Sequence, residues 1–164
     1  MVDSMNIKQN AVLDHISYEK ISSDFNKYKL TEANYRLFKK TDWIVTEKIH
    51  GANFCILTDG NDVCFAKRKA ILAAKEDFFG YQTLAPQLKT KALVIFKTVK
   101  NFYPQTTQIA IYGELFGGEY PHADVQANLN VNAIQTGVYY LPNIEFIAFD
   151  LAYINTQQER NYLD

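Results

Sequence analysis

Lys48 lies where residue types and spacing favour a nucleophilic amine. The preceding residues, "WIVTE", are rich in β-branched and aromatic side chains and predict a strand near 43–46. A second apolar strand, "ANFCIL", follows Gly51, a residue that permits a tight turn or the close approach of a ligand. Strands on both sides would partly bury Lys48, and a partly buried lysine loses its proton more readily. The alternative is an ordinary surface lysine at a turn.

Three polar residues lie close to this lysine in the sequence. Glu47 precedes it directly, and His50 follows two positions later, so that in an extended segment His50 shares a face with Lys48. His50 could equally be a structural histidine with a backbone partner. Asn53 is suited to bind a phosphate or a ribose, although asparagines near turns usually bond to the local backbone.

Further candidates stand in or beside later apolar strands. Arg68 belongs to the basic run 67–69, and its planar guanidinium suits a phosphate or ribose, unless it is simply solvated. Glu114 follows an apolar strand and precedes two glycines, where its carboxylate could hold ribose hydroxyls or a metal-bound water. In "FIAFDLAY", Asp150 interrupts an apolar strand and should have a partner or face a cleft, because burying an unpaired carboxylate is costly. Phe149 offers an aromatic face for a purine, or is plain core.

The elements that must position these residues follow no regular βαβ alternation. This order favours an α+β fold with mainly antiparallel sheets. The pattern predicts a hairpin over 52–68 that turns at 59–62, strands over 108–118 and 144–153, and irregular chain over 121–143. An amphipathic helix is expected over 85–102, a helix beginning near Glu76, and a helical turn capped by Thr31.

Composition limits the class of protein. With 164 residues, 48% of them hydrophobic, and a net charge of −1, the chain should form one folded domain, 11–164, after a flexible segment 1–10. Residues 61–100 carry 8 basic and 3 acidic side chains, and residues 101–164 carry 1 and 7, which suits phosphate at one end of a site. Cys55 and Cys64 are expected to be reduced thiols. We expect a cytoplasmic or otherwise intracellular protein, without a signal peptide or membrane-spanning segment.

"EKIHGANF" resembles the nucleotidyl-acceptor motif of the RNA ligase 2 family, which includes phage and kinetoplastid RNA-editing ligases. DNA ligases and capping enzymes usually carry Lys-x-Asp-Gly instead. The resemblance continues in order through "FAKRKAILAAKEDFFGYQ", "IYGELFGG" and "FIAFD", and the earlier "ISYEKISSDFNKY" is similar to the family's opening segment. It covers roughly residues 16–153, and four ordered motifs rarely arise together by chance.

The resemblance implies an α+β nucleotidyltransferase (ATP-grasp-like) domain with flanking helices. It implies an ATP-dependent RNA ligase that joins a 3′-hydroxyl to a 5′-phosphate on nicked duplex or single-stranded RNA, with Mg²⁺ or Mn²⁺. Lys48 would carry the AMP, and no dedicated protein metal site is expected. The implied catalytic residues are Lys48, His50, Glu114 and Asp150, and the implied nucleotide-binding residues are Glu47, Lys48, Asn53, Arg68, Glu114 and Phe149.

The chain departs from the family after Tyr153. The family's next two motifs, a glutamate-bearing strand and a Lys-x-Lys-type strand that binds the α-phosphate, have no counterpart here, so the C-terminal strands are expected to be missing. Three explanations remain open: a piece of a longer ligase, a naturally short remnant, or half of a split enzyme completed by a partner chain. A different class, an inactive nucleotide- or RNA-binding module, is the alternative to an enzyme.

Overall fold

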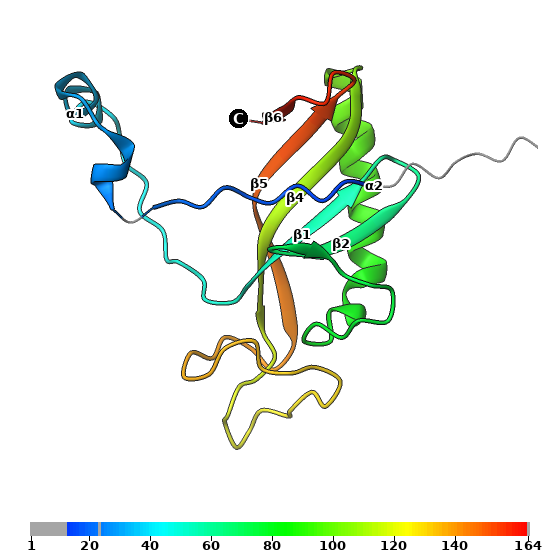
Figure 1. Ribbon diagram of the computed structural model, residues 1–164. Helices are drawn as coiled ribbons and strands as arrows, with labels where there is room; N and C mark the ends of the chain where they lie inside the picture. The colour runs from blue at the N-terminus through cyan, green and yellow to red at the C-terminus, as the bar shows by residue number, and fades with distance from the viewer. Residues whose placement is uncertain (1–12, 23, 164) are drawn as a thin grey trace, which may run out of the picture.

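The computed structural model describes residues 13–22 and 24–163, and within them six strands form one antiparallel sheet (Figure 1). Its strand order is β3-β2-β1-β4-β5-β6. In chain order the strands are β1 (Ala52–Thr58), β2 (Val63–Lys67), β3 (Ala70–Ile71), β4 (Thr106–Gly117), β5 (Ile144–Asn155) and β6 (Arg160–Tyr162). The expected α+β class with an antiparallel sheet is therefore confirmed.

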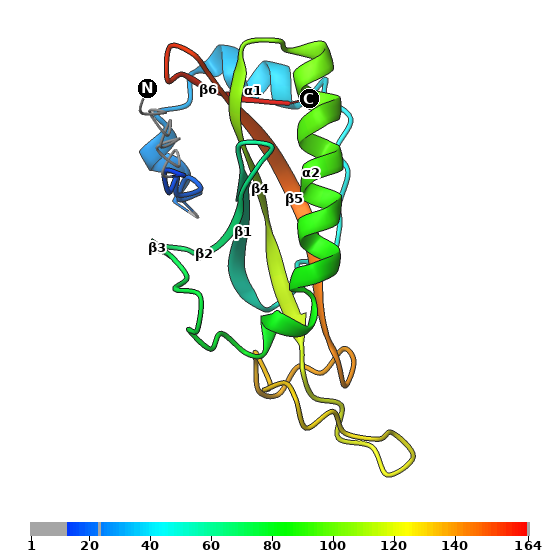
Figure 2. The ribbon, with the colours of Figure 1, turned by 90° about the vertical axis from the view of Figure 1, so that its right-hand side faces the viewer.

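One long helix, α2 (Ala85–Phe102), covers one face of the sheet (Figure 2). Leu88, Ala92, Phe96 and Val99 are its buried residues, and their spacing of three and four places them on one side of the helix. The sequence predicted these bounds and this face correctly. No helix among the described residues is long and apolar enough to cross a membrane.

The opposite face of the sheet is crossed by residues 13–21, here called the N-terminal strap (Figure 1). Gln108 on β4 bonds the strap in both directions, accepting from the Asp14 backbone N–H at 3.3 Å and donating to the Asp14 carbonyl at 2.9 Å. Ser17 donates to the Arg68 carbonyl at 3.2 Å. The strap is thus fixed across the middle strands by hydrogen bonds that the sequence pattern did not reveal.

The chain between the strap and β1 forms a separate arm. It holds a short 3₁₀ helix, η1 (Phe25–Tyr28), and α1 (Glu32–Phe38), which stands apart from the sheet in Figure 1. Thr31 and Asn34 form a reciprocal capping box at the start of α1, as the prediction of a Thr31 cap requires. The remaining short helix, η2 (Tyr81–Thr83), leads into α2.

Three expectations about the elements are wrong. Residues 43–46 form no strand and are exposed: they pair with no strand of the sheet, although β-branched side chains favour one. No helix begins near Glu76, where the chain turns instead and reaches η2. β5 is not buried throughout, because β6 pairs only with Ala152–Ile154, and Ile147 and Phe149 remain 44% and 49% exposed.

The remaining expectations about the elements are confirmed, or concern residues that the structure does not describe. The hairpin over β1 and β2 and the irregular chain over 121–143 are confirmed, and both cysteines are free thiols. β6, in a polar stretch, was not foreseen. The expected flexible segment 1–10 lies outside the described residues.

Phe54 is the centre of the aromatic core between the sheet and α2. It is fully buried, and its ring centroid lies 5.5 Å from those of Phe65 and Tyr81 and 5.8 Å from that of Phe146. The preceding residue, Asn53, points to the opposite face of the sheet because side chains alternate along a strand. Core packing on one face therefore fixes the register of the polar residues on the other.

We predict that Phe54→Ala lowers the free energy of unfolding by about 3–5 kcal/mol, because it removes a fully buried ring and leaves a cavity. The measurement is urea denaturation followed by circular dichroism. Phe102→Ala is the matched control: Phe102 is 77% exposed, and a surface change of this kind should stay within about 0.5 kcal/mol. Equal losses in the two variants would contradict the assignment of Phe54 to the core.

Candidate active site

The pairing of β1 with β4 sets the polar residues of the strap face. Asn53 lies directly opposite Glu114 in the register, on the same face as the apolar cluster of Cys55, Leu57 and Tyr112. Arg68 begins the turn directly after β2 and lines the same hollow as Asn53 and Glu114. Three candidates that are far apart in sequence are thus brought to one face, Asn53 and Glu114 by strand register and Arg68 by its place at the end of β2.

Gly51 lets the lysine segment enter β1 against this pair. A Cβ at position 51 would lie 2.1 Å from the Leu115 carbonyl oxygen and 2.9 Å from the Glu114 side chain, distances that no side chain tolerates. The glycine of the Lys-x-His-Gly pattern is therefore required by close approach of two backbones. A positive φ is not the reason for a glycine here.

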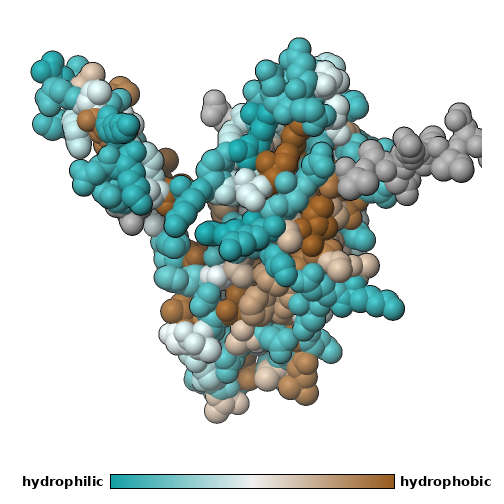
Figure 3. All heavy atoms as spheres, in the orientation of Figure 1, coloured by the Kyte–Doolittle hydropathy of each residue, from teal (hydrophilic) through white to brown (hydrophobic). Residues whose placement is uncertain are grey.

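A cavity of about 380 Å³ joins these strands to the strap and to the lysine. The space-filling view shows hydrophobic surface in the middle of this sheet face, bordered by hydrophilic residues (Figure 3). The lining residues are Tyr18, Glu19, Lys20 and Ile21 from the strap, with Lys48, Asn53, Arg68, Glu114 and Phe149 from the rest of the chain. Five of the residues singled out from the sequence thus meet around one hollow.

Two neighbouring cavities share part of this lining. One of about 390 Å³ is lined by Glu47, Lys48, Glu114 and Phe149, together with Thr46, Ile49, Ile147 and Ala148. The other, of about 450 Å³, contains Arg68, Glu114 and Phe78, with Gly51, Ala52, Asn53, Lys67 and Lys69. Glu114 lines all three cavities, so its carboxylate stands at their junction.

Lys48 is exposed, and the partial burial expected from two flanking strands is absent. The segment that carries it is irregular and is held instead by the long loop between β4 and β5. Tyr140 accepts a hydrogen bond from the His50 backbone N–H at 3.0 Å, and the Gln135 side chain donates to the Gly51 carbonyl at 2.9 Å. The amine thus reaches the cavity from a loop.

The carboxylate of Glu114 is held among opposing influences. Burial raises its pKa above the ordinary value, while a backbone hydrogen bond from Gly51 and the charges of Lys48, Arg68 and His50 act to lower it. Burial dominates, so the pKa of Glu114 is raised overall. The cations around it therefore offset only part of the cost of placing a carboxylate at the junction of the cavities.

A bulge in β5 determines how Phe149 and Asp150 point. Tyr112 pairs with Asp150 and Gly113 with Ala148, which leaves Phe149 without a direct partner on β4. An extra residue of this kind puts two consecutive side chains on the same face of a sheet. Tyr18 of the strap touches both: its ring centroid is 5.0 Å from that of Phe149, and its hydroxyl donates to Asp150 Oδ2 at 2.9 Å.

Two of the expected catalytic residues stand outside the cavities that Lys48 lines. His50 is exposed and is absent from their lining, and Asp150 faces Tyr18. The expectation that Asp150 has a partner or a cleft is met by a tyrosine from the strap. Sequence reasoning missed the contribution of Tyr18 and Lys20, although the likeness of "ISYEKISSDFNKY" to a family segment was a signal that this stretch belongs to the site.

The side chains fit a nucleotide better than they fit a metal ion by itself. No group of three or more His, Cys, Asp or Glu side chains able to hold a metal occurs within residues 13–22 and 24–163. Lys20, Lys48 and Arg68 provide positive charge around the cavity, and Glu114 provides one half-buried carboxylate. A divalent ion would fit here through one carboxylate and the oxygens of a bound phosphate, as Mg²⁺ commonly does.

An α+β domain with an antiparallel sheet, and a lysine at a cavity on its face, is consistent with a nucleotidyltransferase-like ligase domain. The family model described as RNA ligase matches residues 41–164. The chain therefore belongs to the RNA ligase family, as the motifs in its sequence predicted.

Two curated proteins show the same relationship. RNA-editing ligase 2, mitochondrial, of Trypanosoma brucei brucei (strain 927/4 GUTat10.1) is 34% identical over 131 residues, which cover 71% of this chain and 32% of the relative. RNA-editing ligase 1, mitochondrial, of Trypanosoma brucei brucei is 28% identical over 143 residues, which cover 74% of this chain and 30% of the relative. The chain spans about a third of the length of these relatives.

We predict that Gly51→Ala lowers the free energy of unfolding by about 1–3 kcal/mol, because the new methyl group must push β1 away from the Leu115 carbonyl. Urea denaturation measures this change. The same displacement weakens the backbone hydrogen bond to Glu114, so the pKa of that carboxyl should rise further. An unchanged unfolding midpoint would show that the two backbones are not in close contact.

We also predict that the Glu114 carboxyl titrates above an ordinary glutamate, and that Lys48→Ala raises its pKa further by removing a nearby cation. Since the folded pKa exceeds the unfolded one, ionisation of Glu114 lowers stability as pH rises from about 4.5 through the folded pKa. Glu114→Gln should abolish that loss. Carbon-detected NMR titration gives the pKa, and urea midpoints across this pH range give the stability. A Glu114 pKa at or below the ordinary value would contradict the dominance of burial.

Proposed function

We propose that this chain contains the lysine-adenylylating site of an ATP-dependent RNA ligase. The observation that carries the proposal is the convergence of Lys48, Asn53, Arg68, Glu114 and Phe149 on one cavity of about 380 Å³. Membership of the RNA ligase family and the names of the trypanosomal relatives support the reaction class.

The nucleotide would bind across the two cavities that Lys48 and Phe149 share. Phe149 is 49% exposed, so its ring is available to stack on adenine. Glu47 lines the second cavity beside it and would bind the edge of the base. Asn53, Arg68 and Glu114 would contact the ribose and phosphates.

In the first chemical step, the neutral Nζ of Lys48 would attack the α-phosphorus of ATP. A nitrogen–phosphorus bond forms, the bond from the α-phosphorus to the bridging oxygen breaks, and pyrophosphate leaves with that oxygen. The amine proton passes to solvent. Arg68 and Lys20 lie around the same cavity, where positive charge would stabilise the negative charge that develops on the phosphates.

A divalent ion would be held by Glu114 together with phosphate oxygens of the nucleotide, and it would supply positive charge that neutralises the phosphates. The protein side chains determine the rest: Phe149 and Glu47 fix the base, and Asn53 and Arg68 hold the sugar and phosphates in line with Lys48. Such positioning is a large part of catalysis in phosphoryl-type transfers.

The later steps would use the same site for RNA. A 5′-phosphate oxygen of the RNA attacks the phosphorus of the lysine-bound AMP and releases the amine, which gives an RNA–adenylate. The 3′-hydroxyl of the adjoining RNA then attacks the 5′-phosphate, and AMP leaves. The third cavity, with Arg68, Lys69 and Phe78, provides the basic and aromatic surface that an RNA end requires.

The test is intact-mass spectrometry of the chain after incubation with ATP and Mg²⁺. We expect one added adenylyl group on the wild type and none on Lys48→Ala, because Lys48 is the lysine that both belongs to the acceptor motif and lines the cavity. Lys97→Ala, which removes an exposed lysine of α2 on the other side of the sheet, is the control and should be labelled like the wild type.

Two outcomes would contradict the proposal. Labelling that persists in Lys48→Ala would place the nucleophile elsewhere. A folded wild type that binds ATP without forming an adduct would contradict adenylylation by this chain alone. Where the adduct forms, competition between nicked RNA and nicked DNA for sealing tests the nucleic acid that it serves.

A further inference from the structure

We propose that Tyr18 and Asp150 are a positioning pair, in which the strap tyrosine holds the Phe149–Asp150 bulge against the nucleotide cavity. Asp150 then takes no part in the chemistry itself, contrary to the role that its motif suggests. The inference rests on the proposed function, because it concerns how the same cavity is shaped.

The oxygens of Asp150 are already engaged by the protein. Oδ2 accepts a hydrogen bond from the Tyr18 hydroxyl at 2.9 Å, and Oδ1 accepts one from the Leu151 backbone N–H at 2.9 Å. Asp150 lines neither of the cavities that Lys48 lines. A carboxylate bonded in this way is suited to fix a neighbour in place, and it has no direct path to the lysine amine.

Tyr18 also contacts the ring that borders the cavity. Its centroid lies 5.0 Å from that of Phe149, with 70° between the ring planes, and 5.0 Å from that of Tyr112. One tyrosine thus bonds Asp150 and supports one side of Phe149, the two consecutive residues that the bulge turns to the strap face. Loss of the hydroxyl would free the bulge and, with it, the orientation of Phe149.

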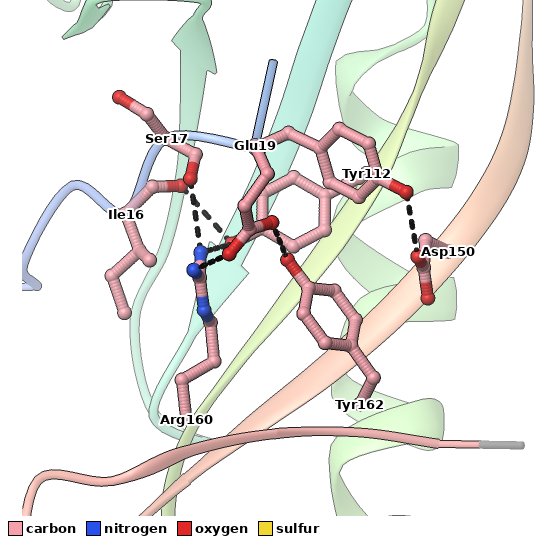
Figure 4. Close-up of polar contacts among 8 residues, drawn as sticks. Ile16, Ser17, Glu19, Tyr112, Asp150, Arg160 and Tyr162 are labelled. Carbon is pink, nitrogen blue, oxygen red and sulfur yellow. Dashed lines mark hydrogen bonds and ion pairs between the residues drawn. The ribbon is translucent and has the colours of Figure 1, made fainter. Parts of the chain in front are cut away.

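The strap that carries Tyr18 is itself anchored to β4 and to the edge strand β6. Arg160 of β6 forms an ion pair with Glu19 and donates to the Ser17 carbonyl at 2.9 Å, and Tyr162 bonds Glu19 (Figure 4). Tyr112 donates to the Ile16 carbonyl at 3.1 Å. These contacts hold the backbone on both sides of Tyr18, so little further backbone freedom is lost when its hydroxyl meets Asp150.

The experiment measures the Kd of α,β-methylene-ATP, which binds like ATP but cannot transfer AMP, for the wild type, Tyr18→Phe, Asp150→Asn and Asp150→Ala. Tyr103→Phe is the matched control, because Tyr103 stacks on Tyr153 on the helix side of the sheet. Adenylylation rates against ATP concentration then separate KM from kcat for each variant. Circular dichroism and urea midpoints confirm that each protein is folded.

We expect Tyr18→Phe to weaken nucleotide binding roughly tenfold, the size of one hydrogen bond to a charged acceptor. The change should appear in KM with kcat nearly unchanged. Asp150→Ala should weaken binding at least as much. Asp150→Asn should keep most of the affinity, because its side-chain oxygen can still accept from the Leu151 N–H while its amide nitrogen donates to the Tyr18 hydroxyl. Tyr18→Phe combined with Asp150→Ala should be no worse than Asp150→Ala, because both remove one interaction.

Three results would overturn the inference. Unchanged Kd and KM in Tyr18→Phe would show that the tyrosine positions nothing. A loss of kcat in Asp150→Asn as complete as in Asp150→Ala, with normal affinity, would make Asp150 a catalytic group. A wild type that fails to bind the analogue would overturn the proposed function together with this inference, whereas the first two results leave the proposed function intact.

Discussion

The carboxylate of Glu114 is the group on which the site depends most. It borders all three cavities, and it is half-buried beside a backbone that Gly51 alone allows to come so close. Placing a carboxylate there has a cost in free energy, because burial raises its pKa. Lys48, Arg68 and His50 offset part of that cost, so the cations of the site and this acid stabilise one another.

The candidate site residues follow from the resemblance to RNA ligase motifs, and local rules explain why some of them share a face. Asn53 and Glu114 occupy strand positions with the same alternation as the apolar residues around them, and α2 has the bounds that its periodicity predicts. Residues 43–46 show the limit of such rules. Their β-branched side chains favour a strand, but a strand also requires backbone pairing with a neighbouring strand, and residues 43–46 pair with none.

The bulge at Phe149 could not have been predicted from the pattern of apolar residues. Strict alternation would send Phe149 and Asp150 to opposite faces of the sheet. One of the two side chains would then point toward α2 and the core. The register shift against Tyr112 and Gly113 sends both to the strap face, and Gly113 makes room, since a Cβ there would lie 2.3 Å from the Ile147 carbonyl. The partner of Asp150 is 132 residues away in the sequence, so no local signal points to it.

The strap explains why a site on an open sheet face has walls at all. Strands supply only a floor, from which Asn53, Arg68 and Glu114 project. Residues 18–21 form one side of the hollow, and Phe149 forms another, raised above the sheet by the bulge. Since Tyr18 bonds Asp150, while Arg160 and Tyr162 hold Glu19, both walls are tied to β5 and β6 (Figure 4). The cavity is thus formed by tertiary contacts between sequence-distant segments, and its shape depends also on side chains outside its lining, namely Asp150, Arg160 and Tyr162.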